Sequence, residues 1–341
     1  MRSELGETPE VVRSLIEKQR GVIDAVAEAI QARPVDMVLM AARGTSDHAA
    51  IYAQYIFGVY NKLPVALAAP SIHSLYGVAP RLRNALVIGV SQSGQSPDVV
   101  GVVEEARSQN CLTIAVTNDV KSPLGRAAEF RIDIHAGPER AVAATKTYVA
   151  ELTALAMLST ALDDDGVARG QLREVPDAIA AALGLEEIVA SAAREQAGMR
   201  RAVVLGRGFN YATALEWSLK LKEMTYVVAD AYSTADFEHG PIAMIDPGFV
   251  VHAIAAEGPT LAEVKTVLGR LREVGARLVV ASNSDEALAF ADVPLRLPAA
   301  PEWLSPLSAI IPGQLFAYHL ALAKRLDTDR PRNIEKVTRT R

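Results

Sequence analysis

The segment "SQSGQSPDVV", residues 91–100, places three serines and two glutamines around one glycine, directly after an apolar run. Backbone N–H groups at a helix N-terminus can bind a phosphate, and serine hydroxyls can add donors without a lysine or arginine. Pro97 suits the first position of a helix and Ser96 suits its N-cap, while Gly94 allows a close approach of the backbone. These residue types fit a phosphate cradle and, equally, a polar turn that caps its own helix.

A second polar segment, "RGTSDHAA" (43–50), follows an earlier apolar run and opens another helical pattern. Thr45 and Ser46 are also common N-cap types. Parallel strands end at one edge of their sheet, so this segment and residues 91–96 can share one site. The segment "VAATKTYVAEL" (142–152) is by itself typical of a packing helix.

Three further side chains could transfer protons or form a covalent bond. "EWSLKLKEMTY" puts Glu216, Lys220 and Glu223 on one helix face, either as an exposed ion-pair ladder or with a carboxylate base. His239 precedes a Gly-Pro break, and an imidazole titrates near neutrality, although a lone histidine is more often structural. Lys336 lies in a polar, basic tail, which is either a frayed terminus or a closing segment that supplies an amine.

The elements that must position these residues are short apolar runs that alternate with helical patterns. This order predicts parallel sheets covered by helices on both faces. In the first half of the chain the apolar runs lie at 35–42, 64–69, 85–90, 112–118 and 130–134.

The second half of the chain repeats the first. Arg43-Gly44 matches Arg207-Gly208 at an offset of 164, and "LTIAVTN" at 112 matches "RLVVASN" at 277 at an offset of 165. Two copies of one α/β domain follow. In the second copy "AAEGPT" (255–260) replaces "SQSGQS" and lacks its serines, which favours a function for the first copy. We expect a helical segment 1–34, a first domain with linking helices 35–185, a second domain 186–326 and a tail 327–341.

Composition excludes several classes of protein. The 341 residues carry a formal net charge of −5, whereas a nucleic-acid-binding protein is expected to be basic. The N-terminus lacks the apolar stretch of a signal peptide, and no apolar run approaches about 18 residues, so we expect a cytoplasmic protein without a membrane span. Cys111 is expected to be a small core residue. No set of histidines, cysteines and carboxylates has metal-ligand spacing, so no metal site is predicted.

Taken together and in order, six segments resemble the SIS (sugar isomerase) family. The resemblance is to the isomerase half of glucosamine-6-phosphate synthase and to stand-alone SIS-type glucosamine-6-phosphate deaminases. It covers nearly the whole chain and rests on "RGTSDHA", "SQSGQSPD", "AGPERAVAATK", "LGRGFNYATALEWSLKLKE", "DFEHGPIAMID" and "DRPRNIEKVT".

The resemblance implies an α/β fold of two tandem SIS domains, each a three-layer αβα unit of flavodoxin type. It implies that Glu223 moves a proton between C1 and C2 of a phosphosugar, and that Lys336 closes the site. It also implies a homodimer in which His239 reaches the neighbouring subunit's site to assist ring opening. Neither a cofactor nor a metal is needed. The implied phosphate ligands are Ser91, Gln92, Ser93, Ser96 and Thr45, and the implied sugar contacts are Ser46, Val142 and Ala143.

Several residues depart from the family pattern. Arg43 stands where the family has a small residue or cysteine, Ala144 replaces a serine, and Pro70-Ser71 stand where an acidic residue is common. Residue 2 is Arg, whereas the synthase begins a glutaminase domain with a cysteine there. We therefore expect deamination of glucosamine 6-phosphate to fructose 6-phosphate and ammonia.

Other functions remain open. A phosphosugar aldose–ketose isomerase or a galactosamine-6-phosphate deaminase could use the same pocket. A sugar-phosphate sensor without catalysis is an alternative of another class. The acidic charge and the presence of Glu223, His239 and Lys336 favour an enzyme over a sensor.

Overall fold

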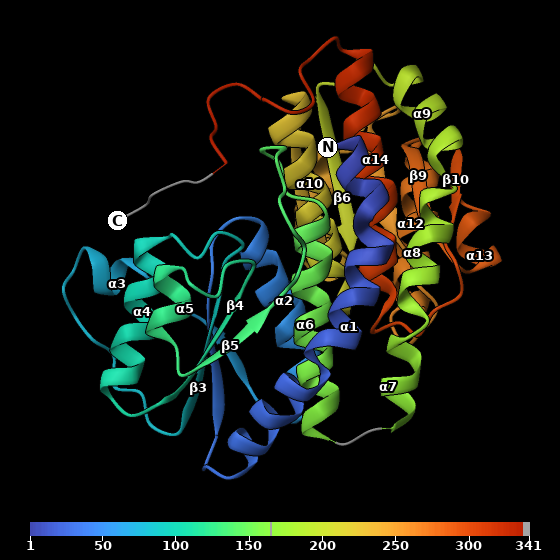
Figure 1. Ribbon diagram of the computed structural model, residues 1–341. Helices are drawn as coiled ribbons and strands as arrows, with labels where there is room; N and C mark the ends of the chain where they lie inside the picture. The colour runs from blue at the N-terminus through green and yellow to red at the C-terminus, as the bar shows by residue number, and fades with distance from the viewer. Residues whose placement is uncertain (164–165, 337–341) are drawn as a thin grey trace. The chain divides into compact units, whose positions relative to one another are not determined.

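The computed structural model describes residues 1–163 and 166–336, which divide into two compact units (Figure 1). Each unit contains one five-stranded parallel sheet. The repeat-1 unit comprises residues 10–139 and 144–174 and the described residues from Glu335 onward. The repeat-2 unit comprises residues 1–9, 140–143 and 175–334.

The sheet of the repeat-1 unit has the order β2-β1-β3-β4-β5, with every pair parallel. Strands β3 and β4 are buried at every position, which explains their continuous apolar sequences. The strands are β1 (Met37–Ala41), β2 (Val65–Leu67), β3 (Ala85–Val90), β4 (Leu112–Thr117) and β5 (Phe130–Asp133). The helices are α2 (Thr45–Val59), α3 (Ser71–Ser74), α4 (Pro97–Ser108), α5 (Pro123–Ala127), α6 (Lys146–Leu162), α7 (Gly166–Leu172) and most of α1 (Arg2–Gln31).

The sheet of the repeat-2 unit, β10-β9-β8-β6-β7, has the same strand order as the first sheet when its strands are counted along the chain. The strands are β6 (Arg201–Gly206), β7 (Val228–Ser233), β8 (Val250–Ile254), β9 (Arg277–Ser282) and β10 (Val293–Arg296). The α-helices are α8 (Val175–Leu183), α9 (Glu186–Glu195), α10 (Tyr211–Thr225), α11 (Thr234–Glu238), α12 (Leu261–Val274), α13 (Asp285–Leu288) and α14 (Ser305–Ala323), and the 3₁₀ turns are η1 (Gly208–Asn210) and η2 (Pro241–Met244). The predicted pair of α/β domains is confirmed.

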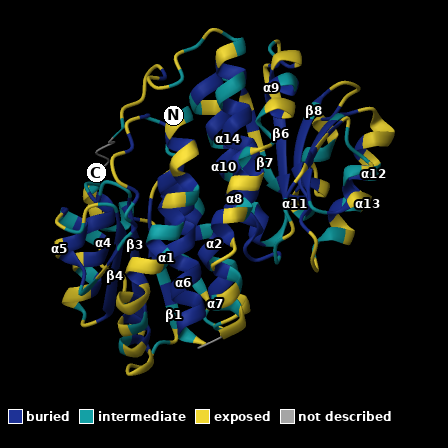
Figure 2. Ribbon diagram, turned by 45° about the vertical axis from the view of Figure 1, so that its right-hand side comes forward, coloured by how far each residue is buried: buried dark blue, intermediate teal, exposed yellow. Residues whose placement is uncertain are grey.

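The strands and the buried faces of the flanking helices form the core of each unit, and exposed residues gather on the outer helices and loops (Figure 2). In the repeat-1 unit every residue of α6 from Lys146 to Ala161 is buried, so its sequence is apolar almost all round. In the repeat-2 unit α14 has this role. Among the described residues α14 alone is long and apolar enough for a membrane span, and 78% of its most apolar window is buried inside the protein, as in a core helix.

One helix between the two repeats lies differently from our expectation. We expected residues up to 185 to pack with the first domain, but α8 packs on α14 in the repeat-2 unit, together with α9, which falls in the segment 186–326 expected there. Both helices are amphipathic, and an apolar stripe does not specify which sheet will cover it. The helical segment expected at 1–34 is the single helix α1, whose first turn is bound in the repeat-2 unit by Arg2 Nε to Glu186 Oε1 at 2.7 Å.

Candidate functional site

The two polar segments found in the sequence lie side by side in the repeat-1 unit. Strands β1 and β3 are neighbours, with Ala41 opposite Gly89, and the segments 43–46 and 91–96 follow their carboxyl ends. Strand β2, which follows β1 in the chain, pairs with one edge of β1. Strand β3 pairs with the opposite edge of β1. Ligands of open parallel sheets bind at such a point, where the strand order reverses.

Hydrogen bonds within the loop 91–96 and the conformation of one glycine hold the shape of this loop. Gly94 has a φ of +61°, and a Cβ at this position would overlap the side chain of Ser122, so only glycine fits. The N–H groups of Gly94 and Gln95 donate to the hydroxyls of Ser91 (3.1 Å) and Ser93 (3.2 Å). Ser96 is the N-cap of α4, but its hydroxyl makes no capping hydrogen bond to any described residue. The Ser96 side chain therefore does not cap α4, whereas Ser91 and Ser93 bond the backbone of the loop itself.

Two partly buried pairs fix the other side of this rim. The hydroxyl of Ser46 donates to Oε1 of Glu151 on α6 at 2.9 Å. Nε of Arg43 binds Oδ2 of Asp98 at 2.7 Å, where the carboxylate is fully buried and the arginine side chain is 47% exposed. Thr45, half-buried, begins α2 between them. Arg43 thus places a positive charge at the carboxyl end of the sheet, where the serine loop 91–96 contains no lysine or arginine.

A buried carboxylate that sequence reasoning missed, Glu139, connects the tail to the start of α6. Its oxygens accept hydrogen bonds from the N–H of Thr145 (2.9 Å), the hydroxyl of Thr147 (2.7 Å) and Nζ of Lys336 (2.7 Å). Burial alone would raise the pKa of Glu139, but the charge and hydrogen bond of Lys336, with the threonine donors, lower it below its ordinary value. Lys336 is therefore paired in this structure, with its side chain 23% exposed.

The carboxylate expected to transfer protons belongs to a three-residue ion cluster on α10 of the repeat-2 unit. Nζ of Lys220 lies 2.6 Å from Oε2 of Glu223 and 3.2 Å from Oε1 of Glu216. Lys220 and Glu216 are fully buried, while Glu223 is 23% exposed. The cluster is therefore not an exposed ladder, and only Glu223 reaches solvent. Burial alone would lower the pKa of Lys220, but the two carboxylates raise it well above its ordinary value, so the lysine stays a cation.

The C-terminal tail lies on the end of the same helix. The guanidinium of Arg332 lies 4.0 Å from the ring centroid of Tyr226, the C-cap residue of α10, and the backbone N–H of Arg332 donates to the tyrosine hydroxyl at 2.9 Å. The carbonyl of Asp329 accepts from the N–H of Val142 at 3.2 Å. The tail thus joins the backbone near Ala143 to the helix that carries Glu223, all within the repeat-2 unit.

His239 stands apart from these contacts. It follows α11 on an exposed loop, and Gly240 after it has a φ of +140°. Its N–H donates to the carbonyl of Asp236 at 3.2 Å. An exposed imidazole on such a loop is accessible to a second molecule.

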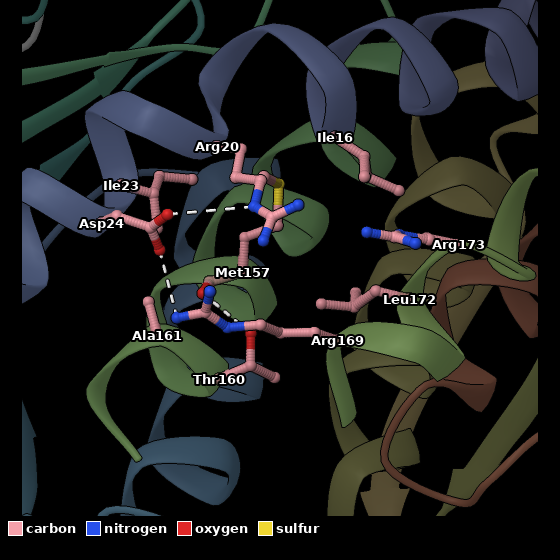
Figure 3. A pocket seen from close by; sticks show the side chains of 10 residues that line it. All are labelled: Ile16, Arg20, Ile23, Asp24, Met157, Thr160, Ala161, Arg169, Leu172 and Arg173. Atoms are coloured by element: carbon pink, nitrogen blue, oxygen red, sulfur yellow. Dashed lines mark hydrogen bonds and ion pairs between the residues drawn. The ribbon is translucent and has the colours of Figure 1, made fainter. Parts of the chain in front are cut away.

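A partly open hollow lies elsewhere in the repeat-1 unit, among α1, α6 and α7 (Figure 3). In Figure 3 Asp24 faces both Arg20 (3.9 Å) and Arg169 (3.1 Å). None of the candidate site residues lines this hollow. Within residues 1–163 and 166–336 no group of three or more histidines, cysteines and carboxylates is placed to hold a metal ion.

Comparison with known proteins assigns the class of the chain. The family model described as "SIS domain" matches residues 33–161 and 197–324, one match to each sheet. The chain belongs to the SIS domain family, and the resemblance found in the sequence is confirmed.

Particular relatives narrow this class. The glutamine–fructose-6-phosphate aminotransferase (isomerizing) of Pyrococcus horikoshii is 34% identical over 345 residues, which cover 98% of this chain and 57% of the relative. The chain thus spans a little over half the length of this curated relative. A solved C-terminal domain of glucosamine-fructose-6-phosphate aminotransferase from Francisella tularensis has a TM-score of 0.85 at 25% identity, covering 96% of this chain and 97% of that domain. A provisionally named phosphosugar isomerase from Silicibacter pomeroyi DSS-3 has a TM-score of 0.87 at 34% identity, covering 96% and 99%.

Proposed function

We propose that this protein is a phosphosugar enzyme that hydrolyses glucosamine 6-phosphate to fructose 6-phosphate and ammonia. The observation that carries the proposal is the loop 91–96, a serine-rich cradle at the reversal point of a parallel sheet whose Ser96 hydroxyl does not cap its own helix. The names of two relatives contain fructose 6-phosphate, which supports this substrate class.

In the proposed reaction the repeat-1 unit binds the phosphate. Ser91, Gln92, Ser93 and Ser96, with Thr45, donate hydrogen bonds, and the start of α4 adds a favourable dipole. Ser46 and the backbone of Val142 and Ala143 contact the sugar. His239 of a neighbouring subunit assists ring opening.

Glu223 then carries the proton transfer. Its carboxylate removes the proton from C2 of the open-chain amino sugar and returns it to C1 through an enolamine. The resulting C2 imine adds water and releases ammonia, which leaves the ketone of fructose 6-phosphate. Lys220 orients the carboxylate through the 2.6 Å ion pair. Lys336 closes the site, and an imine with the ketose product requires it to leave its ion pair with Glu139 and lose a proton.

The test is an assay of ammonia and fructose 6-phosphate formed from glucosamine 6-phosphate. Galactosamine 6-phosphate, N-acetylglucosamine 6-phosphate and glucose 6-phosphate are assayed beside it. Ammonia from the first substrate supports the proposal. Ketose from glucose 6-phosphate without ammonia from any amino sugar would instead show an aldose–ketose isomerase, and binding without turnover would show a sensor.

The variant Glu223→Gln separates catalysis from binding. We expect it to lower kcat by at least about a hundredfold, because a general base is worth roughly two to four orders of magnitude. Glu257→Gln, at an exposed position of the same unit, is the matched control and should keep its activity. Full activity in Glu223→Gln would refute the assigned base.

We also propose that the protein is cytoplasmic and acts as a homodimer. The exposed position of His239 supports the dimer, because an imidazole on such a loop can reach a second subunit. The pairing of α14 with its own unit supports a protein that does not enter the membrane.

A further inference from the structure

The second sheet keeps the backbone plan of the phosphate cradle. Gly44 and Gly94 of the first repeat correspond, at the same offset of 164, to Gly208 and Gly258 of the second. All four have positive φ, at +57°, +61°, +57° and +152°. The N-cap of the following helix also keeps a hydroxyl, because Thr260 begins α12 where Ser96 begins α4.

A repeated glutamate follows the last strand of each sheet. "AGPE" ends at Glu139, six residues after β5, and "AAPE" ends at Glu302, six residues after β10. The first glutamate binds Lys336 and the start of α6. The second has a different partner.

Glu302 lies in the cradle of the repeat-2 unit. It is 9% exposed, and the hydroxyl of Thr260 donates a hydrogen bond to its Oε1. A Cβ built on Gly258 would overlap the carboxylate, so the side chain lies directly against the backbone of this loop. A buried carboxylate is thus seated at the N-terminal end of α12, a helix of 14 residues.

The backbone carbonyl of Glu302 is held by a chain of hydrogen bonds. Its carbonyl accepts from the hydroxyl of Ser305 at 2.7 Å, and that hydroxyl accepts from Nδ2 of Asn210 at 2.7 Å. Asn210 belongs to the turn η1 that contains Gly208. The carboxylate therefore enters the cradle from a rigid loop rather than from a freely rotating surface position.

We propose that the second repeat retains an anion cradle and that the carboxylate of Glu302 occupies it as an internal ligand. The N-terminus of a long helix favours a negative group, and no substrate phosphate can enter while the carboxylate is present. Removal of the carboxylate uncovers a site for a small oxyanion such as inorganic phosphate. This inference does not depend on which reaction the first repeat catalyses.

The experiment compares phosphate binding by two variants in a Ser93→Ala background, which weakens the first cradle. Glu302→Ala removes the seated carboxylate. Glu257→Ala removes an equal charge from an exposed position on the same loop and is the matched control. Thermal unfolding is followed with and without 10 mM inorganic phosphate at constant ionic strength, and phosphate stoichiometry is measured by calorimetry.

We expect Glu302→Ala to unfold at a lower temperature than its parent and to regain at least about 2 °C with phosphate, with one added phosphate per chain. Glu257→Ala should show neither effect. An equal phosphate response in the two variants would overturn the proposal. If Glu302→Ala does not fold, Glu302→Ser is measured in the same way; folding that depends on phosphate supports the proposal, and unfolded protein at 100 mM phosphate refutes it. Loss of phosphosugar binding in Ser93→Ala alone tests the first cradle separately.

Discussion

At the scale of single residues, the proposed mechanism assigns phosphate binding to hydroxyl groups of the serine loop and proton transfer to the ion cluster on α10. The Ser96 hydroxyl makes no capping hydrogen bond to its own helix, and Lys220 forms ion pairs with two carboxylates. The Lys220 ammonium is therefore buried with two carboxylates, and the proposed phosphate ligands are neutral groups. Two predictions belong at this scale.

Ser96→Ala should weaken binding of the phosphosugar without changing its chemistry. A hydrogen bond to a charged group contributes about 1.5–3 kcal/mol, so we expect KM to rise about ten- to a hundredfold with kcat nearly unchanged. Ser108→Ala, at the exposed end of the same helix, should leave KM unaltered. Steady-state kinetics measure KM and kcat for both variants. An unchanged KM in Ser96→Ala would contradict the proposal that the loop 91–96 binds the phosphate.

The pairing of Glu139 with Lys336 should be measurable as a coupling energy. Glu139→Gln and Lys336→Met each remove one charge from a pair 2.7 Å apart, of which the carboxylate is fully buried. In a double-mutant cycle followed by urea unfolding, we expect a coupling of about 1–2 kcal/mol, reduced by the partial exposure of the lysine. Glu139→Gln should be the costlier single change, because the buried threonine donors lose their anion. Additive effects of the two substitutions would show that the contact is not energetically significant.

At the scale of elements, the carboxyl ends of the strands and the first turns of the helices position the proposed site. Strand β8 carries a further feature, a fully buried histidine that takes no part in that site. The ring of His252 lies 4.9 Å from Trp217 of α10 and 4.7 Å from Phe316 of α14, centroid to centroid. Neither ring nitrogen has a hydrogen-bond partner among the described residues, and burial lowers the pKa of His252 to about 3.

This histidine should make the protein sensitive to acid. Its pKa is about 3 in the folded state and 6.5 for an ordinary histidine, so the unfolded chain binds the extra proton between these values. Stability should fall as the pH drops below 6.5, by up to about 1.4 kcal/mol per pH unit for this group. Between pH 6.5 and pH 5 the wild type should lose about 1.6 kcal/mol more than His252→Leu in urea unfolding. Parallel pH profiles for the two proteins would refute this assignment.

At the scale of the whole molecule, subunit complementation tests whether His239 acts across a dimer. His239→Ala and Glu223→Gln are each expected to be nearly inactive. When equal amounts are unfolded and refolded together, half of the dimers should be mixed, and each mixed dimer would have one site with both functional groups. About a quarter of wild-type activity should then return. No recovery, together with mixed dimers shown by native mass spectrometry, would place His239 in its own subunit's site.

The sequence by itself determined the repeat, the two parallel sheets and the serine loop. These features depend on residues close together in the chain, such as the apolar runs of β3 and β4 and the Ser-Gly-Pro order before α4. The spacing of Glu216, Lys220 and Glu223 likewise fixed that they share one helix face. Local periodicity and turn chemistry suffice for such predictions.

Only the tertiary structure decided which of these groups are buried and what they contact. The Lys220 face of α10 could have been a solvated ladder, and burial made it an ion cluster. Glu139 pairs with Lys336, which lies 197 positions away in the sequence. Helices α8 and α9 pack in the repeat-2 unit. The repeated glutamates occur in nearly identical motifs, yet one binds a lysine and the other enters a cradle. Burial and ion pairing depend on the packing of elements that are distant in sequence, and local patterns carry no information about that packing.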